Sequence, residues 1–174
     1  MRKDTKLVEA GRSAGPGASP VNPVVQRAST IVFPTLDAYE AAGRNKYSTL
    51  RYGRHGTSTV FALQDAMAEI EGGFRAIALP SGVAAISATL MALAGPGSHL
   101  LVSDAVYGAT RSFCDGHLRQ IGVAVTYYDP AIGAGIEALF RPETVAVYCE
   151  SPGTATFEMQ DIPAIAAVAH RRGA

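Results

Sequence analysis

The sequence predicts an α/β fold in which a predominantly parallel sheet carries helices on both faces. From Thr57 onward, short apolar runs alternate with segments of helical periodicity, and this alternation is typical of parallel sheets. The segment Gly82 to Leu93 is apolar on nearly every side, which predicts a helix that is covered all round. Before Thr57 the regular pattern is missing, which predicts a different kind of structure there.

The elements after Thr57 can be placed one by one. A hydroxyl of Thr57 or Ser58 can cap a helix that ends at Gly72-Gly73. The remaining pattern predicts strands at Ala76–Leu79, His99–Ser103, Val123–Tyr127 and Thr144–Cys149, and helices at Gly82–Leu93, Gly108–Arg119, Ile132–Phe140 and Ile162–Arg172.

Residues 11–35 are rich in proline, glycine and serine and show no helical or alternating period, so they predict an extended arm. The apolar residues Val24, Val25 and Ile31 would gain nothing in a free tail. We therefore expect the arm to lie on another surface.

The composition of the chain argues against several classes of function. Fifteen basic and fifteen acidic residues give zero net charge, so nucleic acid is not an expected partner. The first thirty residues hold no secretory signal, and the longest apolar stretch is too short to cross a bilayer, which needs ~20 residues. A cytoplasmic protein with reduced thiols at Cys114 and Cys149 is expected. The histidines lack metal-ligand spacing, so no metal site is predicted.

Three places could bind an anionic, ring-containing ligand. Ser81-Gly82-Val83 opens an apolar helix, where backbone amides bind phosphate, although such turns are also common for conformational reasons. Tyr52 and Arg54 would project to one side of an extended segment and could donate to phosphate oxygens; the alternative is an exposed loop. Tyr107 follows a strand, at the edge where ligands of parallel sheets collect, and could stack on a ring; the alternative is a core tyrosine.

Larger motifs carry a resemblance. The run Tyr52-Gly53-Arg54, the segment Glu71-Gly72-Gly73 and the motif Glu150-Ser151-Pro152-Gly153 resemble the Cys/Met-metabolism family of pyridoxal-phosphate (PLP) enzymes, and within it the bacterial cystathionine β-lyases. The resemblance runs from about Lys6 to Ala174. It implies the PLP-dependent transferase-like fold (fold type I), with residues 1–56 as an N-terminal arm and inter-subunit segment and residues 57–174 as the first part of the large PLP-binding domain.

The resemblance also implies roles for single residues. Gly82 and Val83 would bind the PLP phosphate within the subunit, and Tyr52 and Arg54 would reach the phosphate of a neighbouring subunit. Tyr107 would stack on the pyridine ring, so that Tyr52 and Tyr107 both belong to the catalytic site. Shared sites require a homo-oligomer, at least a dimer and in this family typically a tetramer.

Two positions bear on the substrate. His55 stands where β-lyases commonly have a second arginine, and it would bind a substrate carboxylate with only partial charge near neutral pH. After Glu150-Ser151-Pro152-Gly153 the chain reads Thr154-Ala155, where the γ-synthase and γ-lyase branches have Asn-Pro. Glu150 could instead serve only in capping and turn formation.

The Schiff-base lysine that PLP chemistry needs is missing from the pattern. The lysines are Lys3, Lys6 and Lys46, and none matches the family position. We expect the front part of a β-lyase, inactive alone, whose C-terminal half could be a separate chain; complete, it would convert cystathionine to homocysteine, pyruvate and ammonia in methionine biosynthesis. The alternatives are a γ-synthase or methionine γ-lyase, and an inactive module for assembly. A Rossmann-like dinucleotide binder is disfavoured because no GxGxxG follows a strand.

Overall fold

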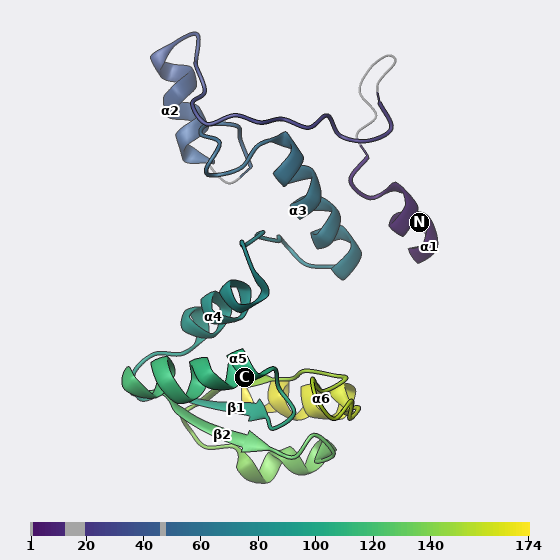
Figure 1. Ribbon diagram of the computed structural model, residues 1–174, viewed down its shortest axis with the longest axis vertical. Helices are drawn as coiled ribbons and strands as arrows, with labels where there is room; N and C mark the ends of the chain where they lie inside the picture. The colour runs from purple at the N-terminus through teal and green to yellow at the C-terminus, as the bar shows by residue number, and fades with distance from the viewer. Residues whose placement is uncertain (1, 13–19, 46–47) are drawn as a thin grey trace. The chain divides into compact units, whose positions relative to one another are not determined.

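The chain divides into two units, Met1–Ala78 and Leu79–Ala174, in a computed structural model that describes residues 2–12, 20–45 and 48–174 (Figure 1). The first unit is helical and the second contains the sheet. We predicted a division after residue 56 from the expected roles of the two parts, and not from their compactness. That division stays a prediction.

The first unit contains helices α1 (Lys3–Glu9), α2 (Leu36–Arg44) and α3 (Ser58–Glu71). The prediction of α3 is confirmed, and the helix ends at Gly72 in the left-handed conformation, with φ 69°. Neither α1 nor α2 was predicted. The Thr35 hydroxyl accepts a hydrogen bond from the Ala38 amide at 3.2 Å and thereby caps the N-terminus of α2.

The N-terminal cap of α3 differs from the prediction. Thr57 makes no capping hydrogen bond with its side chain. Instead the Gln26 side chain, far away in sequence, accepts from the Ser58 amide at 3.0 Å and from the Ser58 hydroxyl at 2.9 Å. The Thr59 hydroxyl accepts from the Gln26 amide at 2.8 Å. A long-range contact therefore satisfies the Ser58 amide, one of the first four amides of the helix that have no intrahelical acceptor.

The predicted arm is confirmed over residues 20–35, which form neither helix nor strand apart from one isolated bridge between Thr30 and Tyr52. Residues 13–19 of the arm lie outside the described residues. The arm lies on α3, as expected, but through polar and backbone contacts. Its valines remain exposed, Val32 by 90% and Val24 by 68%.

The second unit contains a parallel sheet, as predicted. Within the described residues the sheet has the strand order β2-β1-β3, formed by β1 (His99–Ser103), β2 (Ala124–Tyr128) and β3 (Thr144–Tyr148). The helical elements of the unit are α4 (Gly82–Leu93), α5 (Gly108–Phe113), the π-helical turn η1 (Cys114–Leu118), the 3-10 helix η2 (Gly133–Leu139) and α6 (Ile162–Arg172).

The central strand β1 separates two apolar clusters. Leu100 and Val102 pack with residues of α4, α5 and η1 on one face, while Leu101 packs with residues of η2 and α6 on the other. Figure 1 shows β1 and β2 side by side below α5. Every residue of β1 is buried, as expected for a strand with both faces covered. The prediction of helices on both faces is confirmed.

Two predictions were wrong. Ala76–Leu79 forms no strand, and Ile77 is 68% exposed. The helix α4 is not covered all round: α5 packs against it, but Met91 and Leu93 remain about half exposed. Both predictions assumed that an apolar run has neighbours on every side, and the described residues do not supply them.

A buried histidine joins the three strands. The His99 imidazole lies 2.7 Å from the Thr144 hydroxyl of β3, through Nδ1, and 2.9 Å from the Thr126 hydroxyl of β2, through Nε2. Both hydroxyls already accept from Arg141, through its backbone amide at 2.8 Å and its guanidinium at 3.0 Å. Burial lowers the pKa of His99, and the charge of Arg141 lowers it further against the opposing effect of Glu143. The neutral imidazole is therefore the form that the fold stabilises.

This buried histidine makes stability depend on pH. The unfolded chain binds a proton at His99 more readily than the folded chain, so its contribution is present above about pH 6.5 and is lost as the pH falls below that value. His99→Gln keeps hydrogen-bonding groups but cannot titrate. In urea unfolding between pH 7.5 and 5.5, the wild type should lose more free energy of unfolding than His99→Gln. Equal losses would contradict the assignment.

Candidate functional site

The carboxyl ends of β1 and β3 hold the best-organised polar cluster of the second unit. Tyr107 stands at the N-terminus of α5, and its amide donates to the Glu150 carboxylate at 3.1 Å (Oε1) and 3.2 Å (Oε2). The tyrosine is 49% exposed. Tyr107 therefore lies at the predicted edge of the sheet with an accessible ring, whereas the alternative was a core tyrosine.

The Glu150 carboxylate binds the loops after the two strands to each other. It also accepts from the Thr154 hydroxyl, and the Thr154 amide donates to the Ala105 carbonyl at 2.9 Å. At Gly153 the loops approach so closely that a Cβ would lie 2.6 Å from the Ala105 Cβ. The capping role that the sequence left open for Glu150 is present, and a negative charge is favourable at the start of a helix.

Gln160 connects all three strands at this edge, although no sequence signal pointed to it. Its Nε2 donates to the Glu150 carbonyl at 2.7 Å and to the Ser103 hydroxyl at 3.2 Å, and its Oε1 accepts from the Tyr128 hydroxyl at 2.8 Å. Gln160 is buried. The backbone amide of Gln160 donates to the Ser151 hydroxyl at 2.9 Å. The side chain and the backbone of Gln160 therefore both hold the loop after β3.

A cavity of about 450 Å³ opens beside the ends of β1 and β2, and its acidic lining residues are Asp104, Asp129 and Glu158. Asp104 accepts from the Arg111 guanidinium, which lies 4.0 Å from the centre of the Tyr127 ring. Burial raises the pKa of Tyr127, and a hydrogen bond to the Asp115 carboxylate raises it further. Carboxylates repel phosphate, so this cavity is not suited to a phosphate group.

The start of α4 has the geometry of an anion site. The Ser81 hydroxyl accepts from the Ala84 amide at 3.1 Å, and the Ala85 amide donates to the Ser81 carbonyl at 3.0 Å. Helix geometry leaves the amides of Gly82 and Val83 without an intrahelical acceptor. No described atom lies within 4 Å of the position of a Cβ at Gly82. A phosphate group can therefore approach these amides closely.

In the first unit, Tyr52, Arg54 and His55 lie in a tight turn, whereas we expected an extended segment. The His55 amide donates to the Tyr52 carbonyl at 2.9 Å, which closes the turn. The turn still brings the side chains together: the Arg54 guanidinium lies 5.4 Å from the centre of the Tyr52 ring, and the His55 ring lies 5.9 Å from it, edge to face.

Glycine is required inside this turn. The Gly53 amide donates to the Ser29 carbonyl at 2.7 Å, and a Cβ at Gly53 would lie 1.7 Å from the Ala28 carbonyl oxygen. The arm therefore packs against the turn at Gly53, and the side chains of Tyr52 and Arg54 remain exposed.

The predicted site residues thus form separate groups. Tyr52, Arg54 and His55 share one turn of the first unit. In the second unit, Gly82 and Val83 begin α4. Tyr107 begins α5. Their roles toward a cofactor or a substrate stay predictions.

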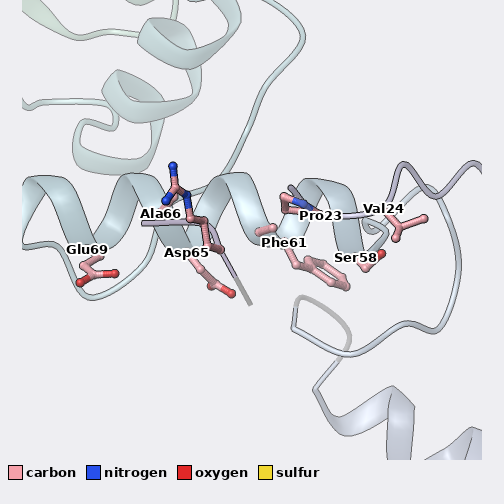
Figure 2. Close-up of a pocket in the computed structure, with 10 residues that line it drawn as sticks. Pro23, Val24, Ser58, Phe61, Asp65, Ala66 and Glu69 are labelled. Atoms are coloured by element: carbon pink, nitrogen blue, oxygen red, sulfur yellow. The ribbon is translucent and has the colours of Figure 1, made fainter. Parts of the chain in front are cut away.

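A further cavity, of about 630 Å³, lies in the first unit between the arm and α3. Figure 2 shows the arm residues Pro23 and Val24 beside Ser58 and Phe61 of α3. None of its lining residues is a predicted site residue, so it adds nothing to the candidate site.

Over residues 2–12, 20–45 and 48–174, no cluster of three or more His, Cys, Asp or Glu side chains could hold a metal ion. The same residues include no helix that is long and apolar enough to cross a membrane.

Comparison with known proteins identifies the family. The model of the Cys/Met metabolism PLP-dependent enzymes matches residues 4–174. The chain belongs to this family. A Rhizobium johnstonii protein is 48% identical over 98% of this chain and 42% of its own length. The cystathionine beta-lyase of Salmonella typhimurium is 44% identical over 97% of this chain and 43% of its own length, and the cystathionine beta-lyase MetC of Escherichia coli is 43% identical over 94% and 42%.

A solved structure agrees with the fold. The cystathionine gamma-lyase of Lactobacillus plantarum, complexed with L-serine, superposes with a TM-score of 0.84 at 31% identity. The superposition covers 99% of this chain and 43% of that one. The chain therefore has the fold of the N-terminal part of these enzymes and spans less than half of the length of the relatives that it matches.

The described residues fit PLP, the cofactor of this family, at several points. The open amides of Gly82 and Val83 suit its phosphate, and the exposed Tyr107 ring suits a stacked pyridine. Lys3 and Lys6 lie in α1 of the first unit, and Lys46 lies outside the described residues. No lysine is present in the second unit.

The central position of Gln160 can be tested by substitution. Gln160→Leu removes the partners of the Glu150 carbonyl and of the Ser103 hydroxyl, and each buried group left without a partner costs roughly 1–3 kcal/mol. We expect a lower urea midpoint by circular dichroism. Gln120→Leu, at an exposed position, is the matched control and should change the free energy of unfolding by less than about 0.5 kcal/mol. Equal midpoints for the two variants would contradict the role of Gln160.

Proposed function

We propose that this chain carries the phosphate-binding and ring-binding part of a PLP-dependent carbon–sulfur lyase of the cystathionine β-lyase type. The open N-terminus of α4 is the observation that carries this proposal, because it combines unpaired amides with space for a phosphate group at Gly82. A polypeptide beyond these 174 residues supplies the cofactor lysine, as a continuation or as a separate subunit. We call the assembly of the two the complete enzyme.

Each site residue has a proposed task. The amides of Gly82 and Val83 bind the phosphate, and the ring of Tyr107 lies against the pyridine and fixes its tilt. The amide of Tyr107 is held by Glu150 on both carboxylate oxygens, so the ring starts from a defined backbone position. PLP, when bound, stabilises negative charge at the substrate carbon from which a proton is removed.

The turn of the first unit serves a neighbouring subunit in this proposal. Tyr52 and Arg54 point outward from a rigid turn, and a guanidinium binds phosphate oxygens in a bidentate manner. His55 contacts the substrate carboxylate. The exposed valines of the arm support assembly into a dimer of shared sites, and into a tetramer, because such apolar surface favours burial against a second subunit.

The reaction proposed is α,β-elimination. Loss of a proton from Cα and cleavage of the Cβ–S bond of cystathionine, followed by hydrolysis, give homocysteine, pyruvate and ammonia. The high identity to cystathionine beta-lyases over nearly the whole chain and the sequence Thr154-Ala155 after Gly153 support this branch. A γ-lyase or γ-synthase is the alternative within the family, and an inactive assembly module is the alternative outside enzymes.

The products distinguish these functions. The complete enzyme, given cystathionine and PLP, should form pyruvate and homocysteine in equal amounts, measured by chromatography of the derivatised products. Formation of 2-oxobutanoate and cysteine instead would identify γ-elimination. Retention of PLP without any turnover of thioether amino acids would favour an inactive module.

Sharing of the site between subunits can be tested with hybrids. Arg54→Ala in the complete enzyme should weaken PLP retention, measured by absorbance after gel filtration. Mixing it with a variant that lacks the cofactor lysine should restore up to roughly a quarter of wild-type activity, since half of the re-formed dimers have one intact site. Arg44→Ala, an exposed arginine at the end of α2, is the control that should retain PLP. No recovery after verified subunit exchange would contradict the shared site.

A further inference from the structure

The short loop between β1 and α5 carries Tyr107, whose ring we assigned to the cofactor. The loop consists of Asp104, Ala105, Val106 and Tyr107. Val106 is buried in the apolar core, whereas Asp104 and Tyr107 are exposed. Apolar packing therefore fixes the middle of the loop, and hydrogen bonds must hold its two ends.

Arg111, in the first turn of α5, bonds to both ends of this loop. Its backbone amide donates to the Tyr107 carbonyl at 3.2 Å. Its guanidinium donates through one nitrogen to the Asp104 carbonyl at 2.7 Å and to the Asp104 carboxylate. A guanidinium suits this task, since it offers several donors in one rigid plane. One residue thus connects the first and the last residue of the loop.

An aromatic ring of β2 holds the Arg111 guanidinium in place. The guanidinium lies 4.0 Å from the centre of the Tyr127 ring, close enough for a favourable cation–π contact. The Tyr127 hydroxyl donates to the Asp115 carboxylate at 3.0 Å and to the Arg111 carbonyl at 3.5 Å. These contacts order a long side chain that would otherwise sample many rotamers.

Arg111 and Glu150 act on different atoms of the loop. The Glu150 carboxylate accepts from the Tyr107 amide, while the Arg111 amide donates to the Tyr107 carbonyl. The two peptide groups that flank the Tyr107 Cα are therefore both bonded. At the start of the loop, the Asp104 amide donates to the Tyr128 carbonyl at 2.8 Å, so the Arg111 guanidinium completes the bonding of Asp104.

We propose that Arg111 is a positioning residue for the Tyr107 ring: by binding Asp104 it holds the loop in the conformation from which the ring meets the cofactor. The inference rests on the proposed function, which assigns Tyr107 to the cofactor. The ion pair is partly exposed, with 36% of the Arg111 side chain and 61% of the Asp104 side chain accessible, so it adds little to global stability. Its loss should act on the loop and not on the fold.

The first measurement needs no cofactor. In the chain alone, labelled with isotopic tyrosine, NMR follows exchange of the Tyr107 amide proton with water, and Tyr107→Phe identifies the signal. Arg111→Met keeps an unbranched side chain without the guanidinium, and it should speed this exchange at least roughly tenfold because the loop opens more often. Arg119→Met is the matched control, since it removes an exposed arginine that pairs with Asp115 at 3.4 Å and leaves the bonds of the loop intact.

The second measurement uses the complete enzyme loaded with PLP. The visible circular dichroism of bound PLP depends on how the cofactor ring is tilted against its neighbours, which include Tyr107 in our proposal. Arg111→Met should lower this signal per bound PLP at least about twofold, and it should lower kcat roughly tenfold while KM for cystathionine changes less than about twofold. Arg119→Met should match the wild type in all three quantities.

Two further variants follow the contact itself. Arg111→Lys keeps a charge for Asp104 but lacks the planar group that stacks on Tyr127, so kcat should recover to within about threefold of the wild type. Tyr127→Leu should speed exchange of the Tyr107 amide as well. The double variant Arg111→Met/Tyr127→Leu should exchange no faster than Arg111→Met, because the two residues act through one contact.

Other results overturn the proposal. Equal exchange of the Tyr107 amide in Arg111→Met and Arg119→Met would show that the guanidinium does not hold the loop. Faster exchange at Tyr128 too, which is buried in β2, would indicate a general loss of structure. Unchanged dichroism and kcat despite faster exchange would show that the ring does not depend on the loop. A complete enzyme that binds no PLP overturns the proposed function instead, and exchange of the Tyr107 amide then decides whether Arg111 holds the loop.

Discussion

Gln160 joins the carboxyl ends of the three parallel strands, and the candidate site depends on this interaction. One side-chain amide bonds to Ser103 at the end of β1, to Tyr128 at the end of β2 and to the carbonyl of Glu150 after β3. An amide can donate and accept at once, which neither a carboxylate nor an ammonium group can do. Because Gln160 is buried, each of these bonds is stronger than it would be in water.

The geometry of the candidate site depends on these hydrogen bonds of Gln160. Glu150 is placed by its carbonyl bond to Gln160, and its carboxylate in turn holds the amide of Tyr107. At the other end of the sheet, His99 connects β1 to β2 and β3 through two threonines. The sheet is thus joined by polar side chains at both ends and by apolar packing between them. A rigid edge of this kind can present an aromatic ring to a cofactor without the entropy cost of ordering that ring when the cofactor binds.

Local patterns predicted the parts of this structure that depend on local physics. Apolar alternation found the three strands and α3, α4 and α6, since burial of one face or of both faces fixes the sequence period. The capping of α3 by Gln26 and the bonds of Gln160 to Tyr128 and Ser103 escaped prediction because they join residues 32 to 57 positions apart, and no periodicity records such pairs. The α2 helix was missed, although Thr35 at its N-terminus is of a residue type that commonly caps helices.

The wrong predictions share a physical cause. The run Ala76–Leu79 and the helix α4 are apolar enough to be buried, yet the described residues leave them largely exposed. The sequence of β3 has the same character. Together these segments carry the composition of a larger core than these 174 residues form, in agreement with a chain that spans less than half of its relatives' length.

We propose that this chain provides the surface that binds the phosphate and the ring, while the lysine comes from a polypeptide beyond it. Borohydride reduction of the complete enzyme with PLP fixes the cofactor to the lysine that holds it, and peptide mass spectrometry locates that lysine. We expect one pyridoxyl group per site on a lysine outside residues 1–174. Stoichiometric labelling of Lys3, Lys6 or Lys46 would contradict it.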